Sequence, residues 1–431
     1  MIDKVIIGKI ALSLGLTAAG SAAGLLPTRK QAAHFKSSGV TLCALLLGIR
    51  LAIFLSVFVV LHFDPQSDVT DYYSWASLVN QGHVPGESEE VPLHYGPLFL
   101  PLIGLFLKIW NDPRSLVLCA IFAEFVLFVI WLFIGRMIAN DQVVARAALL
   151  YIFCPLSVIS TAIDGNNDAL AGMFASLFVA LTLWHRPGLG GFVAGLSVVA
   201  SKAITAVVGL PVLLASEHKP RWLIAAVAPV VFVYGVWALL LSIDVVSGLR
   251  FHAIHYSSGN LPFWVGLFGP DLLVAPRRWF VNGLGPLFIL MIASLPLWAY
   301  RSFGHRDVVP IMAALTVALM IVSAKSFPHY MLCALFPILL IIAETTLRSG
   351  IVLYCLFSVL TSVESTLWFR LLNGHSPAMI RESAPSNLSS VLFFGAIETL
   401  LLVTYGVVLW RCTETYWKAI WTRARGRTGP V

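Results

Sequence analysis

The sequence predicts an all-α polytopic membrane protein, with roughly 12 transmembrane helices and an interfacial, helical first external loop. Of its 431 residues, 58% are hydrophobic and only 11% are charged, whereas soluble domains hold about 25% charged residues. Apolar runs of about 20 residues, the length that crosses a hydrocarbon core as a helix, recur along the chain. Because these runs are continuous and do not alternate, they are typical of helices rather than of barrel strands.

The positions of Lys and Arg orient the first part of the chain. A span over 39–62 follows the basic stretch 29–36, so we expect its start in the cytoplasm. The next segment, 63–95, holds six acidic residues and no basic one, and is therefore expected outside. Segment 96–111 is apolar but short and contains two prolines. We expect it to lie in the interface or to dip into the membrane and return.

Further apolar segments then alternate in direction. They are 115–135, 146–163, 168–184, 190–201, 203–215, 222–242, 280–300, 308–324, 330–347, 351–371 and 389–410. This threading leaves sixteen basic residues on the cytoplasmic side and nine outside, as the positive-inside rule requires. The bias indicates that the orientation is correct.

The threading divides the chain into three parts. Residues 1–38 form a cytoplasmic or interfacial N-terminal segment, for which a peripheral position is favoured over an extra span or a signal-like segment. Residues 39–410 form a single transmembrane unit, with 63–114 as the first external loop. Residues 411–431 form a basic cytoplasmic tail.

Charge and cysteine usage exclude other classes of site. The net charge of +7 comes from short basic clusters between apolar spans, so it indicates topology, and we expect no nucleic-acid partner. The six cysteines lie in or at the ends of apolar spans and show no CxxC spacing. They favour neither a zinc site nor a disulfide framework.

Two consecutive segments, 190–201 and 203–215, are each too short to cross a membrane in the usual way. Together they form either one long helix broken at Lys202 or a re-entrant hairpin with Lys202 at its tip. Broken helices at membrane depth are tolerated where they line a cavity. Either arrangement therefore indicates a cavity beside Lys202.

The threading also brings the unusual polar side chains to the external face, whereas the cytoplasmic loops hold mostly arginines. The external set comprises Asp68, Asp71, His94, Tyr95, Asp164, Asn166, Asn167, Asp168, Lys202, His252, His255, Asn260, Lys325, His329 and Tyr330. This segregation indicates an active site outside the cytoplasm.

Four segments in a fixed order carry a resemblance to a known family. They are the acidic Asp68 followed by His94-Tyr95-Gly96-Pro97-Leu98; CPLSVISTAIDGNNDALAGMFASL with Pro155 and Asp168; GGFVAGLSVVASKAITAVVGLPVLL with Lys202 and Pro211; and AKSFPHYMLCALFPILLI with His329 and Tyr330. The set resembles the glycosyltransferase C superfamily, membrane enzymes that use polyprenyl-phosphate sugars. This chain departs from the family in having Gly96 where a proline is usual.

The resemblance implies a mannosyltransferase-like enzyme of the cell envelope, in a bacterial inner membrane or its equivalent. It would move a sugar from a polyprenyl-phosphate donor to a lipid or glycan acceptor on the non-cytoplasmic side, inverting the anomeric carbon. Asp68 would be the general base, with Asp71 as the alternative. The donor phosphate would meet Lys202, Lys325, His329 and Tyr330.

Further substrate contacts are expected from the rest of the external set. They are His94, Tyr95, Asp164, Asn167, Asp168, His252 and His255. We expect no cofactor and no metal site, although the oxygen-rich stretch 164–168 leaves a divalent cation open.

Several simpler interpretations stay open. Asp68 is also suited to cap a helix that begins near Tyr72. Lys202 is equally suited to pair with Asp164 or Asp168, because a charge between apolar runs needs a partner. For the whole chain, a transporter or lipid flippase, a polysaccharide polymerase and an acyltransferase are the competing functions.

Overall fold

The computed structural model describes residues 4–25, 39–88, 90–245, 247, 257–268, 277–372, 374, 379–380 and 388–424, with the side chains of 4–6, 268, 277–282, 370, 388 and 424 excepted. The candidate residues His252 and His255 lie outside this part of the chain. Within it, all regular secondary structure is helical. The all-α class predicted from the sequence is thus confirmed.

The helices follow the apolar segments of the sequence closely. They are α1 (Lys4–Leu25), α3 (Gly39–Phe54, continued by the π-helical turn Leu55–Val60), α4 (Asp68–Asn80), α5 (Phe99–Ile109), α6 (Pro113–Ile138), α7 (Asp141–Ile152), α8 (Pro155–Val158, continued by the π-helical turn Ile159–Ile163), α9 (Asp168–Leu183), α10 (Pro187–Ala200), α11 (Ile204–Ala215), α12 (Lys219–Leu239), α14 (Leu261–Phe268), α15 (Arg277–Tyr300), α16 (His305–Val322), the 3-10 helix η4 (Pro328–Cys333), α17 (Leu335–Glu344), α18 (Leu347–Leu371) and α20 (Leu388–Ala424).

Eight of the described helices are long and apolar enough to cross a membrane, and α7 with α8 makes a ninth, bent by 49°. The multi-pass character is thus supported, but the expected number of roughly 12 spans is not confirmed. The difference lies in α9, α10, α11 and α17, which have 16, 14, 12 and 10 residues. At 1.5 Å per residue they are about 15–24 Å long, less than the roughly 30 Å of a hydrocarbon core.

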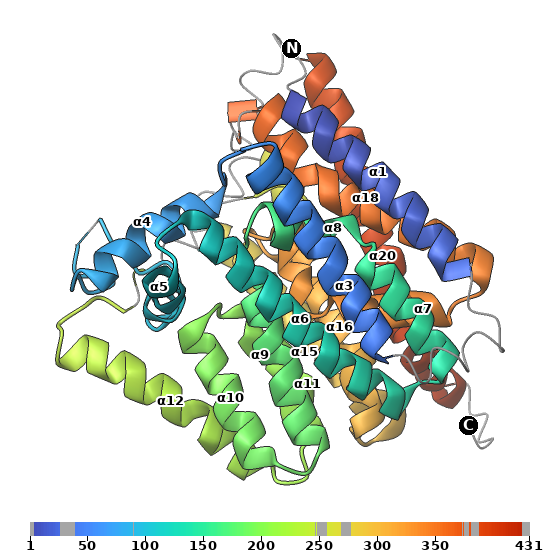
Figure 1. The fold of residues 1–431 in the computed structure, drawn as a ribbon. Coiled ribbons are helices and arrows are strands. Elements are labelled where there is room, and N and C mark those ends of the chain that lie inside the picture. The colour runs from blue at the N-terminus through green and yellow to red at the C-terminus, as the bar shows by residue number, and fades with distance from the viewer. Residues whose placement is uncertain are drawn as a thin grey trace.

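The short helices share one position in the fold. The α9 N-terminus and the α10–α11 turn lie at the end of the bundle where Lys202 is found, which we call the cavity end. Helix α17 begins there too, because it follows η4, which contacts α9 and α11. Helices α4 and α5 lie across this end rather than along the bundle (Figure 1). Helix α5 is the short apolar segment for which an interfacial position is expected.

The N-terminal segment differs from the peripheral position that the sequence favoured. Residues Lys4–Leu25 form α1, which packs along α18 and also contacts α7 and α8 (Figure 1). Gly20 allows this approach, because a Cβ there would overlap the Tyr354 hydroxyl. Small residues let helices pack closely in membranes. Buried Ser13 receives a hydrogen bond from Ser362 Oγ at 3.0 Å.

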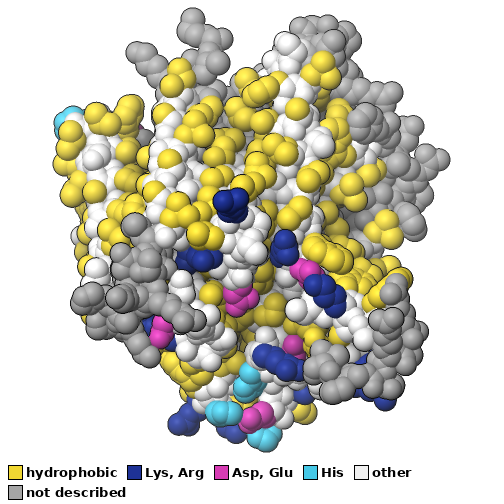
Figure 2. Space-filling view, turned by 90° about the vertical axis from the view of Figure 1, so that its right-hand side faces the viewer, with side chains coloured by type: hydrophobic (Ala, Val, Ile, Leu, Met, Phe, Trp, Pro, Cys, Tyr) yellow, Lys and Arg dark blue, Asp and Glu magenta, His cyan; other side chains and the backbone are white. Residues whose placement is uncertain are grey.

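The C-terminal tail also begins differently from the expected boundary at 411. Helix α20 continues through Ala424, and the Tyr416 hydroxyl donates a hydrogen bond to Asp307 Oδ1 on α16 at 3.0 Å. Figure 2 shows hydrophobic side chains over much of one side of the molecule, with most of the visible basic and acidic side chains in its middle and lower parts. The first part of the basic tail is therefore helical, and it packs against the bundle.

One buried ion pair and its hydrogen bonds join four helices: α3, α6, α7 and the π-helical turn after α8. Arg50 on α3 donates from Nε and Nη2 to the two carboxylate oxygens of Glu124 on α6, both at 2.8 Å. Its Nη1 donates to the Ile152 carbonyl at 2.9 Å, and Thr161 Oγ1 donates to the same glutamate at 2.6 Å. A fully hydrogen-bonded pair of this kind offsets the cost of burying charge. The pair is structural, as mid-span ionisable residues usually are.

Candidate functional site

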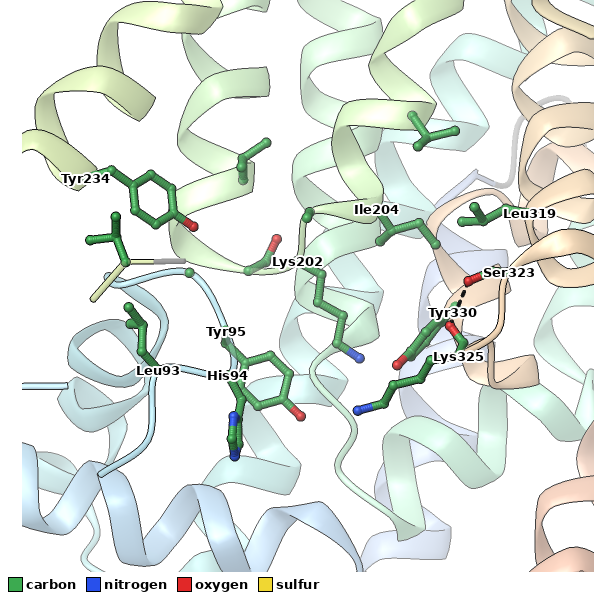
Figure 3. Close-up of a pocket in the computed structure, with 16 residues that line it drawn as sticks. Leu93, His94, Tyr95, Lys202, Ile204, Tyr234, Leu319, Ser323, Lys325 and Tyr330 are labelled. Atoms are coloured by element: carbon green, nitrogen blue, oxygen red, sulfur yellow. Dashed lines mark hydrogen bonds between the residues drawn. The ribbon is translucent and has the colours of Figure 1, made fainter. Parts of the chain in front are cut away.

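A cavity of about 320 Å³ lies at the cavity end, between the loop before α5, the α10–α11 turn and the loop before η4 (Figure 3). Its polar wall is formed by His94, Tyr95, Lys202, Lys325 and Tyr330. Figure 3 shows the amino groups of both lysines and the Tyr95 hydroxyl pointing toward one another. The sequence predicted these five residues as parts of one site, and the fold brings them together.

The rest of the cavity wall is mainly apolar. Val198 and Ile204 come from the two helices that flank Lys202, Leu319 comes from α16, and Tyr234 comes from α12. Apolar walls around a small number of convergent polar groups are typical of ligand-binding pockets. The cavity thus combines a cationic end with a hydrophobic wall.

Helices α10 and α11 form the hairpin that was one of two predicted arrangements. They run antiparallel in Figure 1, and Ser197 Oγ donates a hydrogen bond to Thr205 Oγ1 across the turn at 2.8 Å. Lys202 lies at the tip of this hairpin. Its Nζ is 2.9 and 3.0 Å from the two oxygens of Asp168, a carboxylate with no solvent exposure.

Asp168 is therefore the partner of Lys202, one of the interpretations that the sequence left open. The carboxylate belongs to the first turn of α9, where the helix dipole also favours negative charge. The Lys202 ammonium lies 4.4 Å from the Tyr330 ring centre and 5.7 Å from that of Tyr95. These cation–π contacts hold it at the mouth of the cavity.

Gly96 is required by the contact between the first external loop and α10. A Cβ at this position would overlap the backbone of Val199. The Leu98 N–H donates to the Val199 carbonyl at 2.8 Å, and Gly96 N–H donates to the Ser201 carbonyl at 3.3 Å. The glycine that departs from the family pattern thus allows Tyr95 to approach Lys202.

His329 lies on the other side of Asp168, with Nε2 3.6 Å from Oδ2. Burial lowers the pKa of His329, and the nearby Asp168 charge opposes this only in part. The imidazole also stacks on Phe327, with ring centres 5.2 Å apart and planes inclined by 10°. His329 is consequently a neutral hydrogen-bonding group near pH 7.

Lys325 is the lysine of the cavity whose pKa is clearly shifted. Burial, with the repulsion of Lys202, lowers the pKa of Lys325 to about 8, although Asp68 attracts its charge across the site. A lysine with this pKa carries a proton at pH 7 and loses it slightly above. An anionic ligand would stabilise its charged form.

Asp68 begins α4 but does not cap it. Ser67 occupies the cap position without a side-chain hydrogen bond, and the Tyr72 hydroxyl donates to Asp68 Oδ2 at 3.2 Å. The same hydroxyl is 2.9 Å from that of Tyr95, so a chain of hydroxyls links the carboxylate to the cavity. Ser67 has φ 70° and ψ −160°, a strained region that non-glycine residues adopt mainly at functional sites.

Asp71 is more exposed than Asp68 and lies one turn farther along α4. Partial burial and the Asp68 charge raise the pKa of Asp71. No hydroxyl chain that leads from Asp71 to the cavity is found among the described residues. The geometry therefore distinguishes two acids that the sequence could not separate.

Two other candidates lie beside the cavity rather than in its wall. Asp164 pairs with Lys9 of α1 at 2.9 Å, and Asn167 is buried under α4 with no hydrogen-bond partner for its amide in the described part of the chain. No group of three or more metal-ligating side chains is found among the described residues. The expected absence of a metal site is not tested by this.

Three residues at the site were not among the candidates predicted from the sequence: Lys9, Tyr72 and Tyr234. Tyr72 follows Asp68 by four residues, a spacing that puts the two side chains on one helix face and was open to prediction. Lys9 and Tyr234 reach the site through packing between distant helices, which no local pattern indicates.

The chain matches no protein-family model, and no curated protein sequence is significantly similar to it.

Proposed function

We propose that this protein is a membrane glycosyltransferase that transfers a sugar from a polyprenyl-phosphate donor to a lipid or glycan acceptor. The observation that carries the proposal is the cavity with Lys202 and Lys325 at one end, an apolar wall, and Asp68 linked to it through Tyr72 and Tyr95. The ordered resemblance to the glycosyltransferase C superfamily supports it.

The donor phosphate binds at the two lysines in this proposal. Asp168 already compensates Lys202, whereas burial and Lys202 lower the pKa of Lys325, so an anionic phosphate would stabilise mainly the protonated form of Lys325. The prenyl tail lies along the apolar wall near Val198 and Ile204, where its burial stabilises the complex by about 0.8 kcal/mol per CH₂. Tyr330 and neutral His329 flank the phosphate as hydrogen-bonding groups.

Asp68 acts as the general base. It accepts the proton of the acceptor hydroxyl while that oxygen attacks the anomeric carbon, and the carbon–oxygen bond to the phosphate breaks with inversion. The electron pair of that bond leaves on the phosphate oxygen, which Lys325 and Lys202 stabilise. Burial raises the pKa of Tyr95, so its hydroxyl stays neutral and donates to the Tyr72 hydroxyl, which in turn donates to Asp68.

For the topology, we propose that the short helices also cross, paired with one another, and that the cavity end faces away from the cytoplasm. Together with the long helices and the bent pair they account for the roughly 12 spans expected from the sequence, with α1 in addition. Their shortness leaves the cavity recessed below the membrane surface. The basic residues at the opposite helix ends, such as Arg136, Arg186 and Arg301, support this orientation.

A transfer assay tests the proposal. Purified protein is incubated with a panel of polyprenyl-phosphate sugars and extracted membrane lipids, and labelled products are separated. We expect transfer by the wild type and by Glu87→Gln, which removes an exposed carboxylate from the same loop, and loss in Asp68→Asn. Activity that survives Asp68→Asn combined with Asp71→Asn contradicts the assignment. Movement of intact donor across a vesicle membrane, without transfer, would instead favour the flippase.

A further inference from the structure

The loop that carries Lys325 is held by a second segment, residues 257–260, which leads into α14. Ser257 N–H donates to the Ala324 carbonyl at 2.9 Å. Ser257 Oγ donates to the Ser326 carbonyl at 2.8 Å and accepts from the Ser326 N–H at 2.7 Å. These bonds enclose Lys325 on both sides, so the position of segment 257–260 sets the position of this lysine in the cavity.

Two buried glutamates hold the other side of segment 257–260. Glu364 on α18 and Glu398 on α20 have no solvent exposure. Glu364 Oε1 is hydrogen-bonded to Ser258 Oγ, and the Gly259 N–H donates to Glu398 Oε2 at 2.6 Å. Gly259 lies beside both carboxyl groups, because its N–H bonds Glu398 and a Cβ on it would lie 3.6 Å from Glu364 Oε1.

The second oxygen of each carboxyl group has no donor. Glu364 Oε2 and Glu398 Oε1 are buried and unpartnered, and no described side chain forms an ion pair with either residue. Two ionised carboxylates that face each other in a buried site repel strongly, and such pairs hold a proton in common. One proton between these oxygens turns one of them into a donor and satisfies both.

We propose that Glu364 and Glu398 share one proton, and that this O–H···O bond joins α18 to α20, seats segment 257–260 and thereby positions Lys325. The pair are positioning residues, because they act on the cavity only through Ser258, Gly259 and the serine contacts at 326. The inference rests on packing within this protein and not on the transfer reaction, so it can fail or hold independently of the proposed function.

Among the described residues, few other titratable groups surround the pair. Tyr405 on α20 is buried beside both carboxyls. Helix α14 contributes no ionisable side chain, and α1, which packs on α18, contributes Lys9, already paired with Asp164. Folding takes up the shared proton, because glutamates in the unfolded chain are ionised at neutral pH. Stability is therefore lost as the pH rises and the proton leaves.

Substitution by glutamine tests this directly, since an amide places an N–H where the shared proton lies. At pH 7 in detergent we expect Glu364→Gln and Glu398→Gln to have a Tm at or above that of the wild type, because neither variant needs the proton that wild-type folding takes up. Between pH 7 and 10 we expect the wild type to lose stability that each single glutamine variant keeps. A parallel loss in wild type and variants overturns the proposal.

A second readout reports on Lys325 itself. The rate at which Lys325 is acylated at pH 7.5 is measured by mass spectrometry. The control is Glu344→Leu, which removes an exposed carboxylate on α17. We expect acylation to rise several-fold in Glu364→Leu, which loosens segment 257–260, and to stay at the wild-type rate in Glu364→Gln and in the control. A Glu364→Leu protein that folds but leaves the Lys325 rate unchanged contradicts positioning; if it does not fold, the pH comparison decides alone.

Discussion

At the scale of single residues, Lys202 and Lys325 line the same cavity but have different electrostatic environments. Lys202 is neutralised by Asp168 at 2.9 Å, whereas burial and the neighbouring Lys202 lower the pKa of Lys325 to about 8. In the proposed function, an anionic donor would stabilise mainly the protonated form of Lys325. This residue is therefore expected to control affinity for the phosphate.

We predict that Lys325→Met weakens binding of a polyprenyl phosphate about 10- to 100-fold, the loss of one charge-assisted hydrogen bond of roughly 1.5–3 kcal/mol. In the wild type, binding is strongest below pH 8, where Lys325 is protonated, and weakens as the pH rises through its pKa. Titration calorimetry at pH 7 and 9 measures both effects. Equal wild-type affinity at the two pH values contradicts this role.

Asp168→Asn is predicted to destabilise the fold by about 3–5 kcal/mol, because it leaves the Lys202 ammonium buried without its counter-charge. The double variant with Lys202→Met recovers much of this loss, since the unpaired charge is then gone. Thermal unfolding of the two single variants and the double variant gives the coupling energy. Strictly additive effects of the two substitutions would show that the pair is not coupled.

At the scale of elements, glycines let the helices around the cavity approach each other closely. Gly191 and Gly195 on α10 contact the backbone of α12, where a Cβ would overlap the carbonyls of Trp222 and Ala226. This four-residue spacing of small residues is a common packing motif of membrane helices. It matters for the cavity because α12 supplies Tyr234 to the wall.

We therefore predict that Gly195→Ala moves α12 away from α10, lowers the Tm and weakens donor binding. Gly235→Ala on α12 is the matched control, because a Cβ at that position would meet no atom within 4 Å. Thermal unfolding and donor titration of both variants measure the difference. A Gly195→Ala protein indistinguishable from Gly235→Ala would show that the close contact is not needed.

The sequence predicts most of the helices and of the cavity residues. It does not predict which side chains form ion pairs with them. The α10–α11 turn could be predicted because the two apolar segments on either side of Lys202 are each too short to cross a membrane. Hydropathy and segment length both depend on local composition. The choice of Asp168 over Asp164 as the partner of Lys202 depends on how α9 packs against the turn. Lys9 reaches Asp164 only because α1 joins the bundle, and a segment of modest hydropathy does not reveal that.

At the scale of the whole molecule, the cavity of about 320 Å³ lies where short helices meet the loops before α5 and η4. In the proposed function, a donor with a lipid tail would enter this cavity from the side, with its phosphate at Lys325. An acceptor would arrive at the end where Asp68 and α4 lie. Two substrates of different polarity would then reach one cavity by separate routes.

The proposed orientation is testable by cysteine labelling in intact cells. Gln81→Cys, exposed after α4, is expected to react with a membrane-impermeant maleimide, whereas Ser302→Cys, exposed in the α15–α16 loop, reacts only after permeabilisation. Each variant is compared with the parent protein and its six native cysteines. Labelling of position 302 from outside, with 81 protected, would invert the topology.

The division of roles in the cavity is tested most directly by measuring donor binding and turnover separately in Asp68→Asn. For the Asp68→Asn variant, we expect unchanged affinity for the polyprenyl-phosphate sugar and a kcat lowered about 10²- to 10⁴-fold. For the wild type, we expect a product of inverted anomeric configuration. A variant that turns over at the wild-type rate, or a wild-type product of retained configuration, contradicts the assignment of Asp68 as the base.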